Sequence, residues 1–519
     1  MASPADFEHN LARLRARSPR LAGRVAAADA SGVAAERGPG GAVTLAERGL
    51  RLGSAYDPVT EARRQAEPHA AAKPDLLVAF GVGLALHLEA FRSVCAAPVL
   101  VYEPSPARLR ALLGARAELP LLDAPDVHWA ADLDELGGRV QALYRAGMAV
   151  RSCVHPIVAR LDADAVRDAL DRVAGAKRAI DAAAATRVAM MRTWSELAVD
   201  NAPHLVATPG LTPIAGAFAG VPAVVVAAGP SLDRQLGQLA QAAPRLLVIA
   251  IGQAHRALVR AGIRPDLVHA IESKNVAHQL EGVRDAALVL APSAHPALFE
   301  LPVRARFVAT PEPYRVARWI AARLGETCFV PGGTTVTHSA VHLAVALGAR
   351  DVALIGQDLA FTGGRVYASG SAYDMVSFEA TADGRYAFTN LAEKKKLVGA
   401  DAPEGRRTDE LVWVEGWHGE KVPTSRAYAS FLENYRGIGR HLTACGVRLV
   451  NCTEGGARIP EVAHERFDAW LARQPDRPAG ARARIEAAYD AAPGADADVL
   501  CAAIAAARGR LGALEAAAR

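Results

Sequence analysis

The stretch Val221–Asp233, VPAVVVAAGPSLD, constrains the fold of this 519-residue chain more than any other. Val224–Val226 are β-branched and apolar on both faces, which is typical of a parallel strand covered by helices on both sides. Ala227–Gly229 then carry almost no side chain, and a helix follows with Ser231 or Asp233 as its expected N-cap. The stretch therefore predicts a strand, a small turn and a helix.

Such a turn leaves backbone N–H groups open to a ligand, and the helix N-terminus adds a dipole that favours phosphate. We expect ligand contacts from Ala228, Gly229, Pro230 and Ser231. An ordinary tight turn between strand and helix is the alternative, because Gly-rich turns of this kind are common.

The chain beyond this stretch alternates strands and helices in the order β-α-β-α-β-β-β-α-β. That order predicts an α/β fold with a Rossmann-like, doubly wound parallel sheet. Polar residues follow the strands and would collect along one edge of the sheet, where ligands bind in such folds. These residues are Ser231, Gln253, Glu272, Ser273, Thr334, Gln357 and Asp358.

A smaller Rossmann-like module precedes this domain. Gly81 and Gly83 follow an apolar strand, and Glu103 ends the next one, as in a fingerprint for a dinucleotide or S-adenosylmethionine. The third glycine of the fingerprint is replaced by Ala85 or Leu86. We therefore expect a structural module here, with a working cofactor site as the alternative.

Five segments are predicted from these patterns. Residues 1–72 form a helix and hairpin segment, 73–150 the Rossmann-like N-terminal module, and 151–205 a helical connector. Residues 206–460 form the main domain, and 461–519 an alanine-rich helical C-terminal region.

Composition excludes several classes of function. The formal net charge of +4 is small for this length and gives no support for nucleic-acid binding. No apolar run reaches the roughly 20 residues that cross a bilayer, so we expect a cytoplasmic protein without a membrane partner. The six cysteines lack CxxC spacing, which predicts reduced, structural thiols rather than a zinc site.

Three segments together resemble the motility-associated factor (Maf) family of flagellin glycosyltransferases. They are AAGPSLD at 227–233, PGGTTVTHSAVHLAVALGARDVALIGQDLAFTGGRVYA at 331–368, and NCTEGGARI at 451–459. The resemblance implies transfer of a nonulosonic acid, of the pseudaminic or legionaminic type, from a CMP-activated donor. The acceptors would be Ser or Thr hydroxyls of flagellin in the cytoplasm.

The central domain of that family is similar to bacterial sialyltransferases, which have a Thr-Ser-Gly where this chain has Thr335, Val336 and Thr337. No cofactor is required for such a donor, although Glu272 and Asp358 could hold a divalent cation. The residues expected to bind the nucleotide sugar are Ala228, Gly229, Pro230, Ser231, Gln253, Glu272, Ser273, Gly332, Gly333, Thr334, Thr335, Thr337, Gln357, Asp358 and Tyr367.

The transfer needs a base near neutral pKa to take the proton of the acceptor hydroxyl, and histidine is suited to this. In the similar sialyltransferases the base lies in a mobile loop before a helix, which implies His418 here, with His338 and His255 as rivals. Regular periodicity is lost over residues 372–420, which predicts a lid or a binding loop. A β-hairpin over part of this range is the alternative. The basic run Lys394–Lys396 is read as a solvated helix face.

Two other functions fit the same core. A related archaeal family with a similar central domain is a pterin pyrophosphokinase that uses ATP and magnesium, but this chain has no P-loop Gly-Lys-Thr. A non-enzymatic flagellin-binding scaffold is the second alternative. The retained Gly229, Ser231, Gln357 and Asp358 count against a decayed core.

Overall fold

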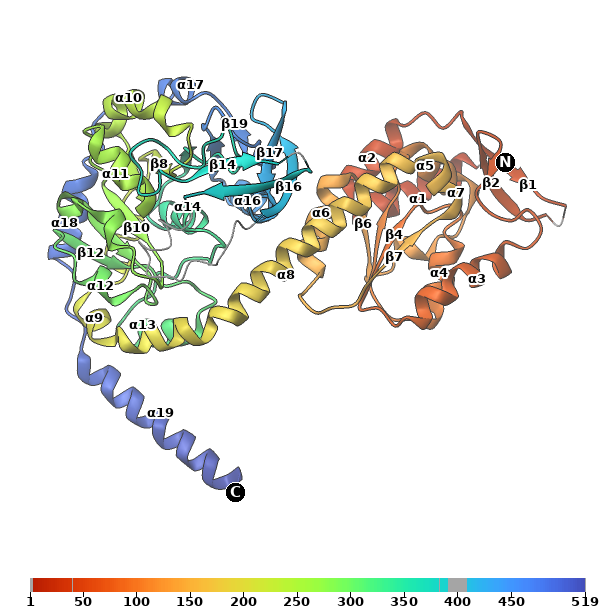
Figure 1. Ribbon diagram of the computed structural model, residues 1–519. Coiled ribbons are helices and arrows are strands. Elements are labelled where there is room, and N and C mark those ends of the chain that lie inside the picture. The colour runs from red at the N-terminus through yellow and green to blue at the C-terminus, as the bar shows by residue number, and fades with distance from the viewer. Residues whose placement is uncertain (1–2, 40, 382, 391–407, 519) are drawn as a thin grey trace. The chain divides into compact units, whose positions relative to one another are not determined.

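The computed structural model describes residues 3–39, 41–381, 383–390 and 408–518 (Figure 1). Contacts divide the chain into two compact units, Met1–Ala184 and Ala185–Arg519. The long helix α8 (Ala163–Asp200) runs through the boundary between them. The run Lys394–Lys396 lies outside the described residues.

Unit 1 is built on a parallel four-stranded sheet in the order β6-β5-β4-β7. Its strands are β4 (Leu76–Phe80), β5 (Val99–Tyr102), β6 (Val127–Ala130) and β7 (Val150–Val154). Its other elements are α1 (Pro4–Arg17), α2 (Pro19–Ala27), β1 (Val33–Arg37), β2 (Val43–Glu47), β3 (Leu50–Arg51), α3 (Pro58–Ala71), α4 (Leu86–Val94), α5 (Pro106–Ala115), α6 (Leu133–Leu143) and α7 (Pro156–Leu161).

Two boundaries in unit 1 differ from the prediction. Strand β7 (Val150–Val154) extends into the range 151–205 that was predicted as a helical connector, and its residues pair with all of β4. The segment 1–72 is also not separate: Leu14 of α1 and Leu45 of β2 are fully buried in the same core as Leu77 of β4. Unit 1 therefore has one Rossmann-like sheet with an N-terminal extension packed onto it.

Unit 2 holds an eight-stranded parallel sheet in the order β12-β11-β10-β9-β8-β13-β18-β19, which confirms the predicted doubly wound fold. All four residues of β8, Ala223–Val226, are buried, as the apolar run predicts. The other strands are β9 (Leu247–Ile251), β10 (Leu267–Ala270), β11 (Ala287–Leu290), β12 (Ala305–Val308), β13 (Asp351–Ile355), β18 (Arg448–Asn451) and β19 (Ala463–His464).

The strand order reverses between β8 and β13. Strands β9 to β12 follow β8 in one direction across the sheet, and β13, β18 and β19 extend in the other. Right-handed crossovers therefore place the helices of the two halves on opposite faces. The helices are α9 (Ala202–Ala207), α10 (Leu232–Ala242), α11 (Gly252–Arg260), α12 (Pro296–Phe299), α13 (Arg315–Arg323), α14 (Val336–Ala346) and α16 (Arg426–Ala444).

The predicted loop 372–420 contains strands. A four-stranded antiparallel sheet in the order β14-β15-β16-β17 is inserted between β13 and β18, and it carries an aromatic cluster in which Phe361 stacks on Phe378 with ring centroids 4.4 Å apart. Its strands are β14 (Ser377–Ala380), β15 (Arg385–Thr389), β16 (Thr408–Glu415) and β17 (Lys421–Ser425). The hairpin part of the prediction is confirmed, and the rest of the loop is more regular than its mixed composition indicates.

The C-terminal region is helical but its first part belongs to the main core. Strand β19 joins the large sheet, and Trp470 of α17 (Phe467–Ala472) is fully buried, with its indole N–H donating to Asp351 over 2.7 Å. Helices α18 (Ala481–Asp490) and α19 (Ala497–Ala518) follow. The boundary predicted at residue 461 therefore cuts through the core of unit 2.

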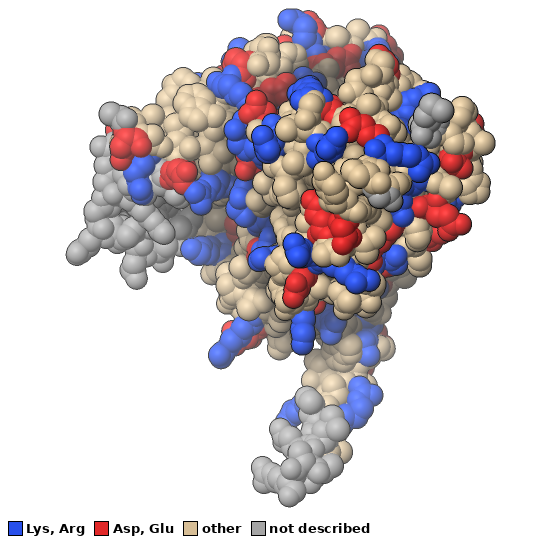
Figure 2. Space-filling view, turned by 90° about the vertical axis from the view of Figure 1, so that its right-hand side faces the viewer, with Lys and Arg blue, Asp and Glu red and all other residues tan. Residues whose placement is uncertain are grey.

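Charged side chains of both signs are mixed on one face of the molecule (Figure 2). Figure 2 shows Lys and Arg side chains interspersed with Asp and Glu on the face in view. All six cysteines are free thiols, and Cys445 and Cys501 are exposed. Within the described part of the chain, no helix has the length and apolar character needed to cross a membrane.

Candidate functional site

One buried carboxylate links the two strands between which the strand order reverses, β8 and β13. Asp358 follows β13, and its side chain accepts hydrogen bonds from the backbone N–H (3.2 Å) and the hydroxyl (2.6 Å) of Ser231, which follows β8. Only 4% of Asp358 is exposed. Burial raises its pKa to about 6, against the hydrogen bonds from Ser231, which lower it. The predicted Ser231 and Asp358 are thus brought into direct contact.

This contact changes the interpretation of the small turn after β8. The N–H of Gly229 donates to the carbonyl of Gly356 (2.7 Å), and the Ser231 donors are used by Asp358. Ser231 occupies the N-cap position of α10, as predicted, but its side chain makes no capping hydrogen bond, and the Asp233 carboxylate accepts from Ser369. The donors of Gly229 and Ser231 are therefore bonded inside the protein, and they do not form the open phosphate cradle that the sequence predicts.

Glycine is required where the turn meets Asp358. A Cβ on Gly229 would lie 2.0 Å from an Asp358 carboxylate oxygen, and one on Gly456 would lie 2.3 Å from the Asp358 carbonyl oxygen. Gly456 also has φ of +67°, which favours glycine. The GPSL and CTEGG motifs thus pack against Asp358 from two sides.

Residues 365–373, which we call the strap, cross the carboxyl ends of β8 and β9. The N–H of Ala368 donates to Ala228 (2.8 Å), and the N–H of Ala372 donates to Gln253 (3.4 Å). Arg365 forms an ion pair of 2.8 Å with Asp233 of α10. The strap therefore fixes Tyr367 at the sheet edge and holds the Arg365 guanidinium against α10.

Electrostatic interactions link a row of tyrosines to the buried Asp358 and the half-buried Glu272 of this edge. Burial is the main cause that raises the pKa of Tyr428, and Tyr367 and Asp358 raise it further. Burial likewise raises the pKa of Tyr373 to about 12, with smaller contributions from Tyr367 and Glu272 that also raise it. The row from Asp358 to Glu272 thus runs along the predicted ligand edge. Tyr428 had no place in the sequence prediction, because a tyrosine in an amphipathic helix has no distinguishing pattern.

Glu272 and Ser273 follow β10 and are half-buried. The Glu272 carboxylate accepts a hydrogen bond from the N–H of Ile271 (3.1 Å), and burial raises its pKa. Strands β8 and β9 separate β10 from β13, so Glu272 and Asp358 lie roughly three strand spacings, about 14 Å, apart. Ligands of one cation each lie about 2.3–2.6 Å from it, so these two carboxylates cannot share one. Among the described residues no group of three metal-ligating side chains is found.

The Gly332–Thr337 turn begins α14 at the same edge. Thr335 is the N-cap and accepts from the N–H of His338 (3.2 Å), while the exposed Thr334 hydroxyl lies 3.1 Å from His338 Nδ1 and accepts from Asn434 (3.0 Å). Thr337 is buried. The first turn of α14 reaches the end of β10, because Ser339 contacts His269 over 2.9 Å.

The candidate bases lie in different surroundings. His338 and His255 are buried at 0% and 1% exposure, and burial lowers their pKa to about 3 and about 4. A buried neutral imidazole in the core is poorly placed to meet a protein acceptor. His418 is exposed on the turn between β16 and β17, where its ring contacts Trp417. That turn is fixed by the Trp417 N–H, which donates to Gly456 (2.9 Å) beside Asp358.

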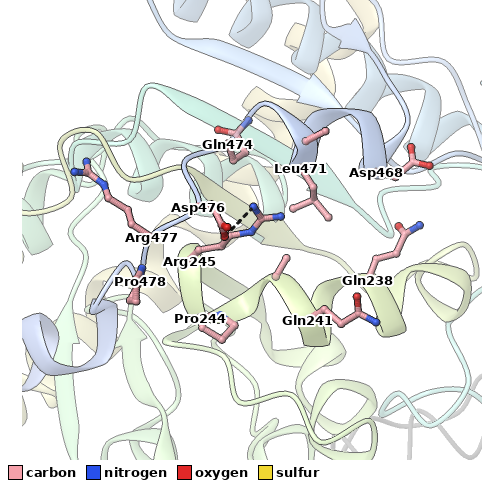
Figure 3. Close-up of a pocket in the computed structure, with 12 residues that line it drawn as sticks. Gln238, Gln241, Pro244, Arg245, Asp468, Leu471, Gln474, Asp476, Arg477 and Pro478 are labelled. Atoms are coloured by element: carbon pink, nitrogen blue, oxygen red, sulfur yellow. Dashed lines mark ion pairs between the residues drawn. The ribbon is translucent and has the colours of Figure 1, made fainter.

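A pocket lies away from this edge of the sheet. Figure 3 shows it between the end of α10 and α17, with a volume of about 780 Å³. Arg245 and Asp476 lie 3.8 Å apart on its wall, and Gln238 and Gln241 line its floor. None of the predicted site residues lines this pocket, so we do not assign the ligand site to it.

Comparison with known proteins gives the following likenesses. Residues 197–364, which include both Ser231 and Asp358, match the family described as "6-hydroxymethylpterin diphosphokinase MptE-like". No curated protein matches the chain. Among solved structures, the MAf glycosyltransferase from Magnetospirillum magneticum AMB-1 is 15% identical with a TM-score of 0.46, over 94% of this chain and 78% of that chain.

Side chains of the protein occupy the space beside the Gly-x-Gly turn of unit 1. A Cβ on Gly81 would lie 2.6 Å from Val158, and one on Gly83 would lie 2.5 Å from the His155 ring. The carboxylate of Glu103 accepts from the N–H of Val82 (2.8 Å) instead of facing solvent. This geometry agrees with the structural module that the missing third glycine predicts.

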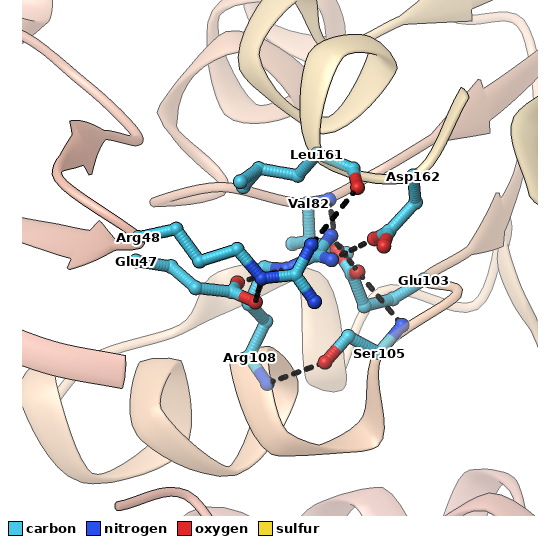
Figure 4. A network of polar contacts seen from close by, with 8 residues as sticks. All are labelled: Glu47, Arg48, Val82, Glu103, Ser105, Arg108, Leu161 and Asp162. Atoms are coloured by element: carbon cyan, nitrogen blue, oxygen red, sulfur yellow. Dashed lines mark hydrogen bonds and ion pairs between the residues drawn. The ribbon is translucent and has the colours of Figure 1, made fainter. Parts of the chain in front are cut away.

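Arg108 holds this turn together, as Figure 4 shows. Its guanidinium is 3% exposed and donates to Glu103 (2.8 Å), Glu47 (2.7 Å) and Asp162. Burial raises the pKa of Glu103, and the positive charge of Arg108 lowers it. Three carboxylates from different parts of unit 1 thus converge on one buried cation.

We predict that Arg108→Met destabilises unit 1 by about 3–5 kcal/mol, because it leaves the buried Glu103 without a cation. Amide hydrogen exchange of peptides from residues 76–102, measured in the full chain, reports the stability of unit 1. The control Arg51→Met removes an exposed ion pair with Glu36 and is expected to cost less than about 1 kcal/mol. Equal protection in the two variants would contradict the structural role of Arg108.

We also predict that Asp358→Asn becomes more stable relative to the wild type as the pH rises. The folded-state pKa of about 6 lies above the ordinary value of 3.8, so the folded protein favours the protonated carboxyl and ionisation destabilises it. Between about pH 4 and pH 8 the difference in the free energy of unfolding should shift by about 3 kcal/mol in favour of the variant. Urea unfolding at both pH values tests this, and parallel pH curves would refute it.

Proposed function

We propose that this protein transfers a nonulosonic acid, of the pseudaminic or legionaminic type, from a CMP-activated donor to Ser or Thr hydroxyls of flagellin, and so supports flagellar assembly and motility. The observation that carries the proposal is that the three motifs of the sequence resemblance meet at Asp358. Ser231 from the first motif bonds Asp358 in the second, and Gly456 in the third packs on its backbone.

The arrangement also suits the charges of such a donor. A CMP-sugar carries one bridging phosphate and one carboxylate, so backbone amides and hydroxyls can hold it without the clamp of a diphosphate. Because the donors of Gly229 and Ser231 are bonded internally, we place the phosphate at the Gly332–Thr335 turn, where the exposed Thr334 hydroxyl and the α14 N-terminus lie. The nucleoside and sugar would extend along the row of tyrosines.

The transfer reaction needs one general base, which takes the proton of the acceptor hydroxyl. The acceptor oxygen attacks the anomeric carbon, the bond from that carbon to the phosphate oxygen breaks, and CMP leaves with the electron pair. The acceptor proton passes to His418, the base that the resemblance implies. Its exposed position on the β16–β17 turn is open to a protein acceptor.

A phosphotransferase is the second candidate, because residues 197–364 match a family whose description names a diphosphokinase. In that case the same edge would hold ATP, a pterin and magnesium. A non-enzymatic scaffold that binds flagellin is the third, and it requires no nucleotide. The three proposals differ in the nucleotide that the protein binds.

We predict that CMP, and not ATP, raises the melting temperature of the purified protein. Ligand present at one hundred times its dissociation constant stabilises the folded state by about 2.7 kcal/mol. Differential scanning fluorimetry with each nucleotide, in the presence and absence of magnesium, gives the comparison. Equal shifts with both nucleotides, a shift with ATP alone, or none with either would reject the CMP donor.

We predict that His418→Ala binds CMP as the wild type does but transfers sugar at least 100-fold more slowly, because general base catalysis contributes about 10²–10⁴-fold. Mass spectrometry of flagellin co-expressed with each variant measures transfer. Lys421→Ala, exposed on the same hairpin, is the matched control and should keep full activity. Transfer by His418→Ala at the control rate would remove His418 as the base.

A further inference from the structure

Helix α13 carries three arginines and no acidic residue. Its sequence, RVARWIAAR, includes Arg315, Arg318 and Arg323. Ala317 and Ile320 are buried in the core, so the three arginines lie on the side of the helix that faces away from it. In the described part of the chain, no ion pair is found for any of the three. Their positive charge is therefore not neutralised within the protein.

Two of these arginines lie over aromatic rings. The Arg318 guanidinium is 4.9 Å from the centroid of the Phe329 ring, and that of Arg323 is 4.0 Å from the centroid of a Trp319 ring. The face of a ring attracts a guanidinium and helps to hold it in place, but carries no net charge that would cancel it. The positive charges are thus held at defined positions.

The neighbouring part of α8 extends this surface (Figure 1). Tyr314, directly before α13, stacks on Trp194 of α8 with ring centroids 4.7 Å apart. Arg187 and Met191 precede Trp194 by seven and three residues, so they lie on the same side of α8. Both are exposed, and 58% of Met191 is accessible to solvent. Two helices therefore contribute to one surface.

This surface has a local excess of positive charge. We call Arg187 and Met191 of α8, together with Arg315, Val316, Arg318 and Arg323 of α13, the arginine face. Of the acids near it in the sequence, Glu196 is paired with Arg192 (Nε to carboxylate oxygen, 2.7 Å), and Glu312 is exposed. The arginines of the face therefore outnumber the acids beside them, although the whole chain has a formal net charge of only +4.

The arginine face begins beside the turn at which we place the donor phosphate. The N–H of Glu312 donates to the carbonyl of Val330 (2.9 Å), so the segment before α13 runs next to the segment before the Gly332–Thr335 turn. A Cβ on Gly332 would lie 3.0 Å from Cγ of Pro313, which precedes Arg315 by two residues. A protein that brings a hydroxyl group to a donor at this turn therefore also meets the arginine face.

The composition of the face favours a protein partner over a nucleic acid. Tryptophan, tyrosine, methionine and arginine are enriched in protein interfaces, where opposite charges face each other across the contact. Lys and Arg are sufficient to bind the phosphates of a nucleic acid, which needs no exposed aliphatic side chains such as those of Met191 and Val316. The partner that fits is a protein surface with acidic residues among apolar ones.

We propose that the arginine face binds the protein acceptor of the transfer reaction through an acidic and apolar surface of that protein. The inference rests on the proposed function, because it names how the flagellin acceptor is held beside the donor. The arginines of the face bind the acceptor and take no part in the chemical step.

Biolayer interferometry with purified monomeric flagellin compares the wild type with three double variants. Arg315→Glu with Arg318→Glu reverses two charges of the arginine face, and Arg315→Lys with Arg318→Lys keeps them. The control, Arg63→Glu with Arg64→Glu, reverses two exposed charges on α3. We expect the charge-reversed variant to bind flagellin at least about tenfold more weakly, because it places like charges opposite the acidic acceptor. The lysine variant and the control should bind within about threefold of the wild type, and wild-type binding should weaken as salt is added.

The outcomes separate the inference from the proposed function. A rise in melting temperature with CMP, equal in all four proteins, shows that each is folded and keeps its donor site. Wild-type flagellin binding by the charge-reversed variant, or an equal loss in the lysine variant or the α3 control, overturns the inference and leaves the CMP donor standing. So does a wild type that fails to bind flagellin, or that binds a poly-dT oligonucleotide in its place. Loss in the charge-reversed variant alone, with no CMP response in any of the four, supports the arginine face and rejects the CMP donor.

Discussion

The Asp358 carboxylate fixes the geometry of the large sheet's ligand edge. It joins Ser231 after β8 to β13 across 127 residues of sequence, at the one point where the strand order reverses. Burial disfavours its charge, and two hydrogen bonds from Ser231 compensate part of that cost. Gly229 and Gly456 are needed because any side chain there would enter the space of Asp358. The small residues of these separate motifs thus have one local cause, a buried carboxylate that needs small neighbours.

The rest of the edge depends on this contact. The segment that follows Asp358 is held by β17, since Thr424 donates to the Leu359 carbonyl (2.7 Å) and Phe361 donates to Pro423 (2.8 Å). The strap and the inserted sheet therefore start from a fixed point. Their aromatic residues, Tyr367 among them, pack in one cluster. The edge is bonded across two strands at Asp358, whereas the Glu272 carboxylate, two strands from β8, accepts from the N–H of its own neighbour Ile271.

The sequence was sufficient for the doubly wound parallel sheet of unit 2, because buried parallel strands are continuous apolar runs. It was insufficient for β7, whose residues Arg151 and Ser152 are exposed and polar, so the strand does not read as buried. The contact between Ser231 and Asp358 could not be predicted, since nothing local relates residues so far apart. The turn after β8 was expected to bind phosphate for the same lack of local information. Its Gly229 and Ser231 donors are instead bonded to Gly356 and Asp358, which are distant in the sequence.

The two glycine turns of this chain show why a motif alone does not identify a site. Both follow a buried parallel strand and lead into a helix, and both place an acidic residue within hydrogen-bond distance of a turn N–H. In unit 1 the turn is covered by His155 and Val158, and the acid has Arg108 as its cation. In unit 2 the acid has neutral donors, and the strands beside it end in polar groups such as Glu272. The distinction between a structural turn and a ligand site therefore lies in what packs over the turn and along the edge beside it.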